Sequence, residues 1–382
     1  MNRLRLFFAS TNLLVLMLGS TTTAHAGKSL VYIGTYTEGG TSEGIYLFHF
    51  DDANGAIIPA GTAGISTNPS FLAINPEENL LFAVGETRDF NGGETGSVAS
   101  FKIDPSDGKL SEINRVSSGG GSPCHLSLTK TGKHLLVANY HGGNVAVMPV
   151  GDDGMLSEHS SLIQHKGSSA NPKRQEAPHA HSINPDNVSK RFFAADLGTD
   201  ELVIYEMDKP SGKLRRTGAF EVEPGSGPRH LAVNPKGDRL YLLNELKSTV
   251  TVIDYSFGVG KLELLETVST LPQDYKGSSG TAEIQITPNG KFLYASNRGH
   301  DSIACFKIAD DGKLALVEIE PTGGKTPRNF GIHPNGKFII AANQNSNSLT
   351  VFAIDQQSGE LTDTGHSAEC PKPVCVTFYQ PN

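Results

Sequence analysis

Short apolar runs alternate with turn-forming residues along the whole chain, and the segment 227–245 shows this pattern most clearly. Two apolar runs, Leu231-Ala232-Val233 and Leu240-Tyr241-Leu242, flank the turn sequence Asn234-Pro235-Lys236-Gly237. Runs of this length around a Pro/Gly turn predict a β-hairpin whose strands are buried on both faces. With the turn centred near Gly237, antiparallel pairing sets Arg229 opposite Glu245. A guanidinium and a carboxylate would then meet at the open end of the hairpin.

The same hairpin recurs along the chain at a period of about 50 residues, which is typical of the longer propeller repeats. A third strand follows each hairpin, and a D-x-x-x-G turn such as Asp104–Gly108 usually leads into a fourth. Four strands per copy without a helical pattern predict an all-β fold, a β-propeller of four-stranded antiparallel blades. The copies begin at Pro69, Pro123, Pro178, Pro228, Thr281, Pro327 and Pro373.

The last copy contains a single strand, 374–379, and the beginning of the chain supplies the strands that this copy lacks. Three predicted strands cover residues 30–36, 44–50 and 56–61. Pairing these N-terminal strands with the C-terminal strand would complete a blade and remove two exposed sheet edges. The sequence therefore predicts a seven-bladed ring closed by its two ends.

The first 26 residues are typical of a cleaved export signal. A basic start, Asn2-Arg3-Leu4-Arg5, precedes the apolar run Leu13–Leu18, and Ala24-His25-Ala26 matches a small-x-small cleavage site. The apolar part is short for a membrane span, although an uncleaved anchor is the alternative. We expect a mature protein that starts at Gly27, forms one domain over residues 27–382 and is periplasmic or secreted. No later segment is apolar enough to span a bilayer, so we expect no membrane association after cleavage.

Composition and charge exclude several other functions. The net charge is -8 and basic residues do not cluster, which argues against nucleic-acid binding. The four cysteines show no C-x-x-C spacing, so we expect no zinc site and no other metal or cofactor. Cys370 and Cys375 could pair in an oxidising compartment, and buried thiols are an equally good interpretation.

The residues at the open ends of the hairpins differ from copy to copy. In a propeller these ends meet at one mouth of the axis, where a purely structural repeat would place similar residues. The sequence instead brings three arginines, two glutamates and a histidine to one cleft, which indicates a functional site. The predicted pairs are Ser70/Glu86, Cys124/Tyr140, His179/Asp196, Arg229/Glu245, Ala282/Arg298, Arg328/Gln344 and Val374/Tyr36.

Several motifs resemble the seven-bladed lactonase family over nearly the whole chain after residue 26. They are Val31-Tyr32-Ile33-Gly34-Thr35-Tyr36-Thr37, the P-R-H-L-A-V-N-P hairpin and the L-Y-x-x-N-E strand end. The resemblance implies a catalytic set of a His, an Arg, a Glu and a second Arg. These fall on His179, Arg229, Glu245 and Arg298, although His181 leaves the histidine ambiguous.

The resemblance also implies hydrolysis of a sugar lactone, above all 6-phosphogluconolactone to 6-phosphogluconate. We expect a monomer whose partner is a small anionic lactone. An imidazole exchanges protons readily near neutral pH, so His179 suits the general base and acid, with His181 or Glu245 as the alternative base. Arginines bind carboxylate or phosphate and stabilise an oxyanion, which suits Arg229 and Arg298. Arg328 and Tyr140 are further candidate substrate-binding residues.

Three alternatives stay open. The same cleft could lactonise a carboxymuconate-like acid, as in another branch of the family, or it could bind an anionic ligand without turnover. As the third alternative, Arg229 and Glu245 could form an ordinary cross-strand ion pair, and His125, His181 and His230 could simply pack between blades.

The export signal also bears on the substrate, because it is unexpected for an enzyme of the pentose phosphate pathway.

Overall fold

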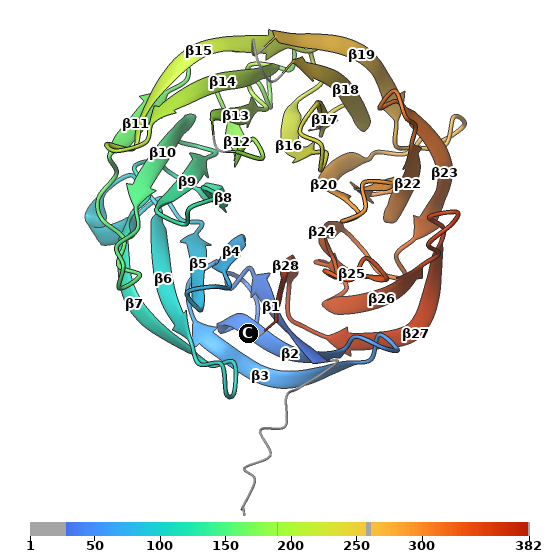
Figure 1. Cartoon of the computed structure of the whole chain (residues 1–382), viewed down its shortest axis with the longest axis horizontal. Coiled ribbons are helices and arrows are strands. Elements are labelled where there is room, and N and C mark those ends of the chain that lie inside the picture. Colours follow the sequence, from blue (N-terminus) through green and yellow to red (C-terminus); the bar gives the residue numbers. More distant parts are fainter. Residues whose placement is uncertain (1–27, 189, 257–260, 381–382) are drawn as a thin grey trace, which may run out of the picture.

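The computed structural model describes residues 28–188, 190–256 and 261–380, and these residues form seven four-stranded antiparallel sheets around an axis (Figure 1). The predicted seven-bladed propeller is thereby confirmed. Residues 1–26, which we interpret as an export signal, lie outside the described residues. In the described part of the chain, no helix has the length and apolar character needed to cross a membrane.

Each blade runs from an inner strand beside the axis to an outer strand at the rim (Figure 1). A 3₁₀ helix, η1 (Phe90–Gly92), is part of the connection between the second and third strands of blade 2. The strands of blades 1 to 3 are, in blade 1, β28 (Pro373–Tyr379), β1 (Lys28–Thr35), β2 (Gly44–Asp51) and β3 (Ile57–Ile65); in blade 2, β4 (Leu72–Asn75), β5 (Leu80–Gly85), β6 (Ser97–Ile103) and β7 (Leu110–Ser117); and in blade 3, β8 (Pro123–Leu128), β9 (His134–Asn139), β10 (Asn144–Pro149) and β11 (Ser161–Gln164).

The remaining four blades follow in chain order. Their strands are, in blade 4, β12 (Ala180–Pro185), β13 (Arg191–Asp196), β14 (Glu201–Asp208) and β15 (Lys213–Glu221); in blade 5, β16 (Pro228–Val233), β17 (Arg239–Asn244), β18 (Thr249–Ser256) and β19 (Lys261–Ser269); in blade 6, β20 (Gly280–Ile286), β21 (Phe292–Arg298), β22 (Ser302–Ile308) and β23 (Leu314–Pro321); and in blade 7, β24 (Pro327–Ile332), β25 (Phe338–Asn343), β26 (Ser348–Ile354) and β27 (Leu361–Glu369).

The two ends of the described chain close the ring in blade 1, as the sequence predicts. Strand β1 pairs with β28 antiparallel, with Leu30 opposite Tyr379, and with β2 on its other side, so both edges of β1 are paired. At Gly34 a side chain would meet the carbonyl oxygen of Pro69 at 2.3 Å, so this close approach of two blades requires glycine. The hydroxyl of the buried Tyr379 also donates to Asn79 Oδ1 in blade 2, which ties the closing strand to the next blade.

Neighbouring blades are joined by apolar packing and by a repeated tyrosine hydrogen bond. The hydroxyl groups of Tyr32, Tyr241 and Tyr294 each donate to a glycine carbonyl in the following blade, at 2.8, 2.8 and 2.7 Å. Two of the acceptors, Gly108 and Gly359, are the glycines of the D-x-x-x-G turns seen in the sequence. The turn motif therefore supplies the acceptor for a buried hydroxyl, which would otherwise be unsatisfied.

The predicted residue pairs at the mouth are wrong in detail, because the inner strands contain a β-bulge. In blade 5, Pro228 pairs with Asn244 and His230 with Leu243, so Arg229 lies in the bulge and not directly opposite Glu245. In blade 4, Ala180 takes the place of Pro228, because it pairs with Asp196. The residue equivalent to Arg229 is therefore His181, and His179 precedes the strand. Aligning Pro178 with Pro228 shifted the predicted pair by two residues.

The structure also shows the state of the four cysteines. All four are buried free thiols, so Cys370 and Cys375 do not form a disulfide. Burial raises the pKa of both thiols to about 12, which keeps them protonated and poorly reactive at neutral pH.

We predict that Tyr379→Ala destabilises the protein by about 3 to 5 kcal/mol, because it removes a large buried side chain from the closing strand. Denaturant unfolding of both proteins measures the difference. Leu264→Ala is the control, since Leu264 is 59% exposed on β19 and its removal should change stability by less than about 0.5 kcal/mol. Equal stability losses in the two variants would contradict a special role for the closing strand.

Candidate active site

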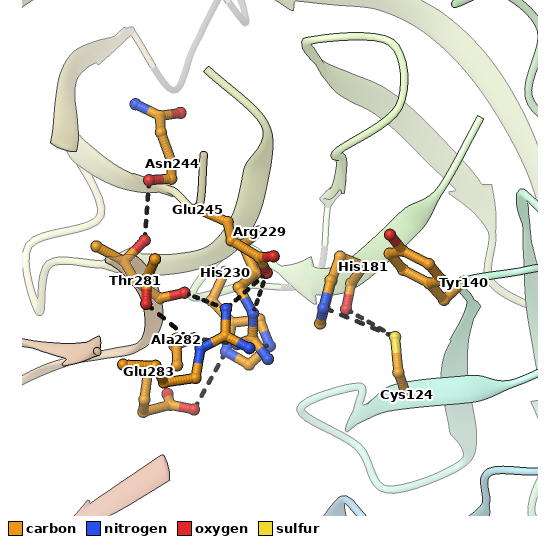
Figure 2. Close-up of polar contacts among 12 residues, drawn as sticks. Cys124, Tyr140, His181, Arg229, His230, Asn244, Glu245, Thr281, Ala282 and Glu283 are labelled. Atoms are coloured by element: carbon orange, nitrogen blue, oxygen red, sulfur yellow. Dashed lines mark hydrogen bonds and ion pairs between the residues drawn. The ribbon is translucent and has the colours of Figure 1, made fainter. Parts of the chain in front are cut away.

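Three arginine side chains converge on the carboxylate of Glu245 at one mouth of the axis. Arg229 Nε donates to Glu245 Oε2 at 3.0 Å, and Arg298 Nη2 lies 3.0 Å from the same oxygen. Arg174 Nη2 donates to the other oxygen, Oε1, at 2.7 Å. The carboxylate is almost fully buried, and Figure 2 shows it facing the Arg229 guanidinium. The fold thus brings together three of the four residues that the family resemblance implies.

Backbone structure explains how these side chains reach one point. Glu245 follows β17, and its amide donates to Gly227 O at 2.7 Å, which holds it beside the start of β16. The bulge releases Arg229 from strand pairing, so its side chain can turn towards Glu245. Arg298 ends β21 and also donates to Thr281 O at 2.8 Å. Two neighbouring blades therefore fix the guanidinium groups in place.

The electrostatics of this cluster keep Glu245 ionised. Burial acts to raise the pKa of Glu245, but Arg298, Arg229 and Arg174 outweigh it and hold that pKa far below its usual range. Burial, with Arg298 and Arg328 adding to it, lowers the pKa of Arg229 to about 10, which still leaves it charged at neutral pH. A carboxylate this acidic, with both oxygens occupied by donors, is a poor proton acceptor.

His179 lies on the blade 4 side of the same mouth. Its Nδ1 donates to Tyr140 O at 3.1 Å, and its ring stacks on the Tyr140 ring with centroids 4.5 Å apart. Its Nε2 lies 3.2 Å from Glu176 Oε1, a largely exposed carboxylate. In the neutral ring the Nδ1 hydrogen bond places the lone pair on Nε2, whereas a hydrogen bond from Nε2 to Glu176 requires a proton on both ring nitrogens.

Asp196 fixes the backbone that carries His179. Its Oδ1 accepts from the amides of His179, Gly198 and Thr199 at 2.8, 2.9 and 3.1 Å. Its other oxygen lies 2.6 Å from His165 Nδ1. Asp196 was predicted only as the partner of His179 at the mouth, and it serves instead as a buried anchor for the turn.

Arg174 and Glu176, which lie between β11 and β12, are site residues that the sequence did not predict. The fully buried Gln175 holds this segment, because its side-chain amide donates to Leu197 O at 2.9 Å and its carbonyl accepts from Asn171 N. The two flanking side chains point to the site: Arg174 Nη2 donates to Tyr140 Oη at 3.2 Å as well as to Glu245. The segment has no repeat or strand period that would have drawn attention to it.

Arg229 also contacts a group of buried polar side chains that includes His230, Glu283 and His181. Arg229 Nη1 is 3.2 Å from His230 Nε2, and His230 Nδ1 is 3.1 Å from Glu283 Oε2 (Figure 2). His181 packs against His230 and lies 3.6 Å from Cys124 Sγ. Burial, partly opposed by Arg229, raises the pKa of Glu283 to about 7. His181 and His230, like His125, are buried ring contacts between blades, as the alternative interpretation predicted.

The other two candidate residues lie on either side of the cluster. Tyr140 is the hydrogen-bond acceptor of Arg174 and the stacking partner of His179. Arg328 belongs to blade 7, and its guanidinium carbon lies 5.3 Å from the centre of the Tyr36 ring. No group of three or more His, Cys, Asp or Glu side chains within the described ranges has the arrangement of a metal site.

Comparison with known proteins gives a consistent result. A family model described as lactonase, 7-bladed β-propeller, matches residues 30–378. The 6-phosphogluconolactonase of Bacillus subtilis is 37% identical over 352 residues, which are 92% of this chain and 98% of that protein. The 6-phosphogluconolactonase of Formosa agariphila is 34% identical over 79% of this chain and 86% of its own. The solved structure of a periplasmic gluconolactonase from Pseudomonas aeruginosa superposes with a TM-score of 0.86 at 34% identity, covering 93% of this chain and all of that one (100%).

We predict that Glu245→Gln lowers the free energy of unfolding at pH 7 by about 3 kcal/mol, because it leaves clustered guanidinium groups without their counter-charge. The folded pKa of Glu245 lies below the unfolded value, which is about 4.3. The stability it provides is therefore fully present above the unfolded pKa and is lost as the pH falls through the folded pKa.

Denaturant unfolding of the two proteins at pH 7 and below pH 4 tests this, and the difference between them should shrink in acid. Glu223→Gln is the matched control, because Glu223 is exposed in its pair with Lys247 and should contribute less than about 1 kcal/mol. A Glu245→Gln variant as stable as the parent at pH 7 would show that the arginines do not depend on this carboxylate.

Proposed function

The chain belongs to the seven-bladed β-propeller lactonase family, and from this premise we propose that it hydrolyses a sugar lactone, foremost 6-phosphogluconolactone to 6-phosphogluconate. The observation that carries the proposal is the group of guanidiniums around Glu245, with His179 beside it. Such a cleft suits a substrate whose carbonyl oxygen becomes negative during the reaction. Water adds to the carbonyl carbon, the ring C–O bond breaks, and the product is the open-chain hydroxy acid.

In this proposal His179 handles the protons. Its neutral form keeps Nδ1–H on Tyr140 O, so the lone pair lies on Nε2, which takes a proton from an attacking water that replaces Glu176 beside it. The imidazolium that results donates this proton to the ring oxygen as the C–O bond breaks. Glu176, 3.2 Å from Nε2, stabilises the imidazolium between the two steps.

Arginines stabilise the negative charge, and Glu245 holds them in position. Arg298 and Arg174 are both partly exposed, so each keeps donors that can face a substrate. Because Glu245 is strongly acidic and its oxygens are occupied, we assign it to positioning and not to water activation. This favours His179 over Glu245 as the general base.

We also propose that residues 1–26 export the protein and that the mature chain begins at Gly27. The structural similarity to a protein described as a periplasmic gluconolactonase supports this location. A periplasmic enzyme would meet lactones formed outside the cytoplasm, which makes gluconolactone a substrate to test beside its 6-phosphate.

We predict that the protein releases acid from 6-phosphogluconolactone or gluconolactone in a pH-indicator assay corrected for spontaneous hydrolysis. His179→Gln should lower kcat by roughly 10²- to 10⁴-fold, since it removes the general base. His49→Gln is the matched control, because His49 is exposed on β2 and should leave kcat unchanged. Saturable lactone binding without acid release would favour a binding platform, and turnover of only a carboxymuconate-like acid would favour the lactonising reaction.

We predict in the same assay that Arg298→Ala lowers kcat by about 10²- to 10³-fold, because it removes a charged donor from the developing oxyanion. Arg215→Ala is the control, since Arg215 is 71% exposed on the outer strand β15. A loss confined to KM would show that Arg298 binds the ground state and the transition state equally.

A further inference from the structure

A second polar group lies across the mouth from Glu245, between blades 7, 1 and 2. It comprises Glu86, Ser70, Tyr36 and Arg328, and a small cavity lined by three of them (Ser70, Glu86 and Arg328) extends to Arg229. Tyr36 Oη donates to Glu86 Oε2 at 2.9 Å, and Ser70 Oγ donates to the same oxygen. These two donors fix the carboxylate through Oε2. Within the described ranges, Glu86 Oε1 accepts no hydrogen bond from the protein.

Arg328 is partly buried and has hydrogen-bond donors that no protein group uses within the described ranges. Its guanidinium carries five N–H donors, yet it donates to no protein acceptor in the part of the chain that the structure describes. Its contact there is with the face of the Tyr36 ring at 5.3 Å. Glu86 and Arg328 are close enough for their charges to interact but form no ion pair with each other. Glu86 and Arg328 thus line one cavity, and the side chain of each has unused hydrogen-bonding capacity.

The chemistry of a matching ligand follows from this pair. A phosphate or carboxylate would satisfy Arg328 but would meet the negative charge of Glu86. A hydroxyl group satisfies both, because it accepts from the guanidinium and donates to the carboxylate. Charged partners also make these hydrogen bonds stronger than those between neutral groups.

We infer that the Glu86–Arg328 cavity, which has room for about one hydroxyl group, is a subsite for a ring hydroxyl of the substrate, so that the enzyme selects hydroxylated lactones over unsubstituted ones. This inference rests on the proposed function and adds to it the two residues that recognise a hydroxyl group of the sugar lactone. A hydroxyl bound on the side of blades 7, 1 and 2 leaves the lactone carbonyl towards Arg298 and His179. An anionic substituent of the substrate lies outside this cavity.

The test compares two six-membered lactones, gluconolactone, which carries hydroxyls, and δ-valerolactone, which carries none. Glu86→Gln should lower kcat/KM for gluconolactone by about 10- to 100-fold, the range for loss of a hydrogen bond to a charged group. For δ-valerolactone, kcat/KM of the variant should stay within about twofold of that of the parent protein, which is the scatter expected of a neutral change. This result would also show that the variant is folded. Glu77→Gln is the matched control, because Glu77 is exposed at the opposite end of the same blade.

Other outcomes overturn the inference. If Glu86→Gln lowers kcat/KM equally for both lactones, Glu86 positions the catalytic residues instead of binding a hydroxyl. If it lowers kcat/KM for neither lactone, Glu86 has no role in substrate binding. If Arg328→Gln weakens the reaction of 6-phosphogluconolactone alone, the cavity is a phosphate site. If the parent protein hydrolyses no lactone, the proposed function fails separately. Calorimetry with gluconate then decides: weaker binding by Glu86→Gln supports the subsite, and unchanged or absent binding overturns it.

Discussion

The candidate site depends on the ion pairs of the Glu245 carboxylate, which is the shared acceptor of three guanidinium groups. These come from separate parts of the chain: Arg229 from blade 5, Arg298 from blade 6 and Arg174 from the segment before blade 4. Without a buried negative charge at their centre, the cations would repel one another and turn towards solvent. With it, they are fixed before a substrate arrives, so little reorganisation is needed when negative charge develops.

In the proposed reaction, the same arrangement gives different tasks to Glu245 and His179, the two residues that the sequence offered as alternative bases. Three positive neighbours make Glu245 a stable counter-ion and, for the same reason, a weak base. His179 lies against the neutral ring of Tyr140, with Nδ1 fixed by a carbonyl and the backbone fixed by Asp196. The environment of Glu245 therefore suits the positioning role that we propose for it, and that of His179 suits the proposed proton transfer.

The sequence was sufficient to predict the seven-bladed ring, because the same pattern of strands and turns recurs in every blade. It could not reveal the bulge in the inner strands: Pro178 and Pro228 look equivalent, yet Ala180 occupies the place of Pro228. The contact of Arg174 with Glu245 could not be predicted from the sequence for another reason. It reaches Glu245 from an irregular segment whose course depends on buried hydrogen bonds of Gln175, and no local pattern encodes those contacts.

The bulge also explains how one quasi-symmetric scaffold can carry an asymmetric site. Residues equivalent to Arg229 in other blades include Cys124, His181, Ala282 and Arg328, which differ in size and charge. A bulged residue is released from strand pairing, so its side chain turns to the axis without changing the strand register or the apolar packing between blades. Substitution there costs the fold little, whereas the strand residues on either side are constrained by burial. The chemistry of the mouth can therefore vary while the ring that carries it stays the same.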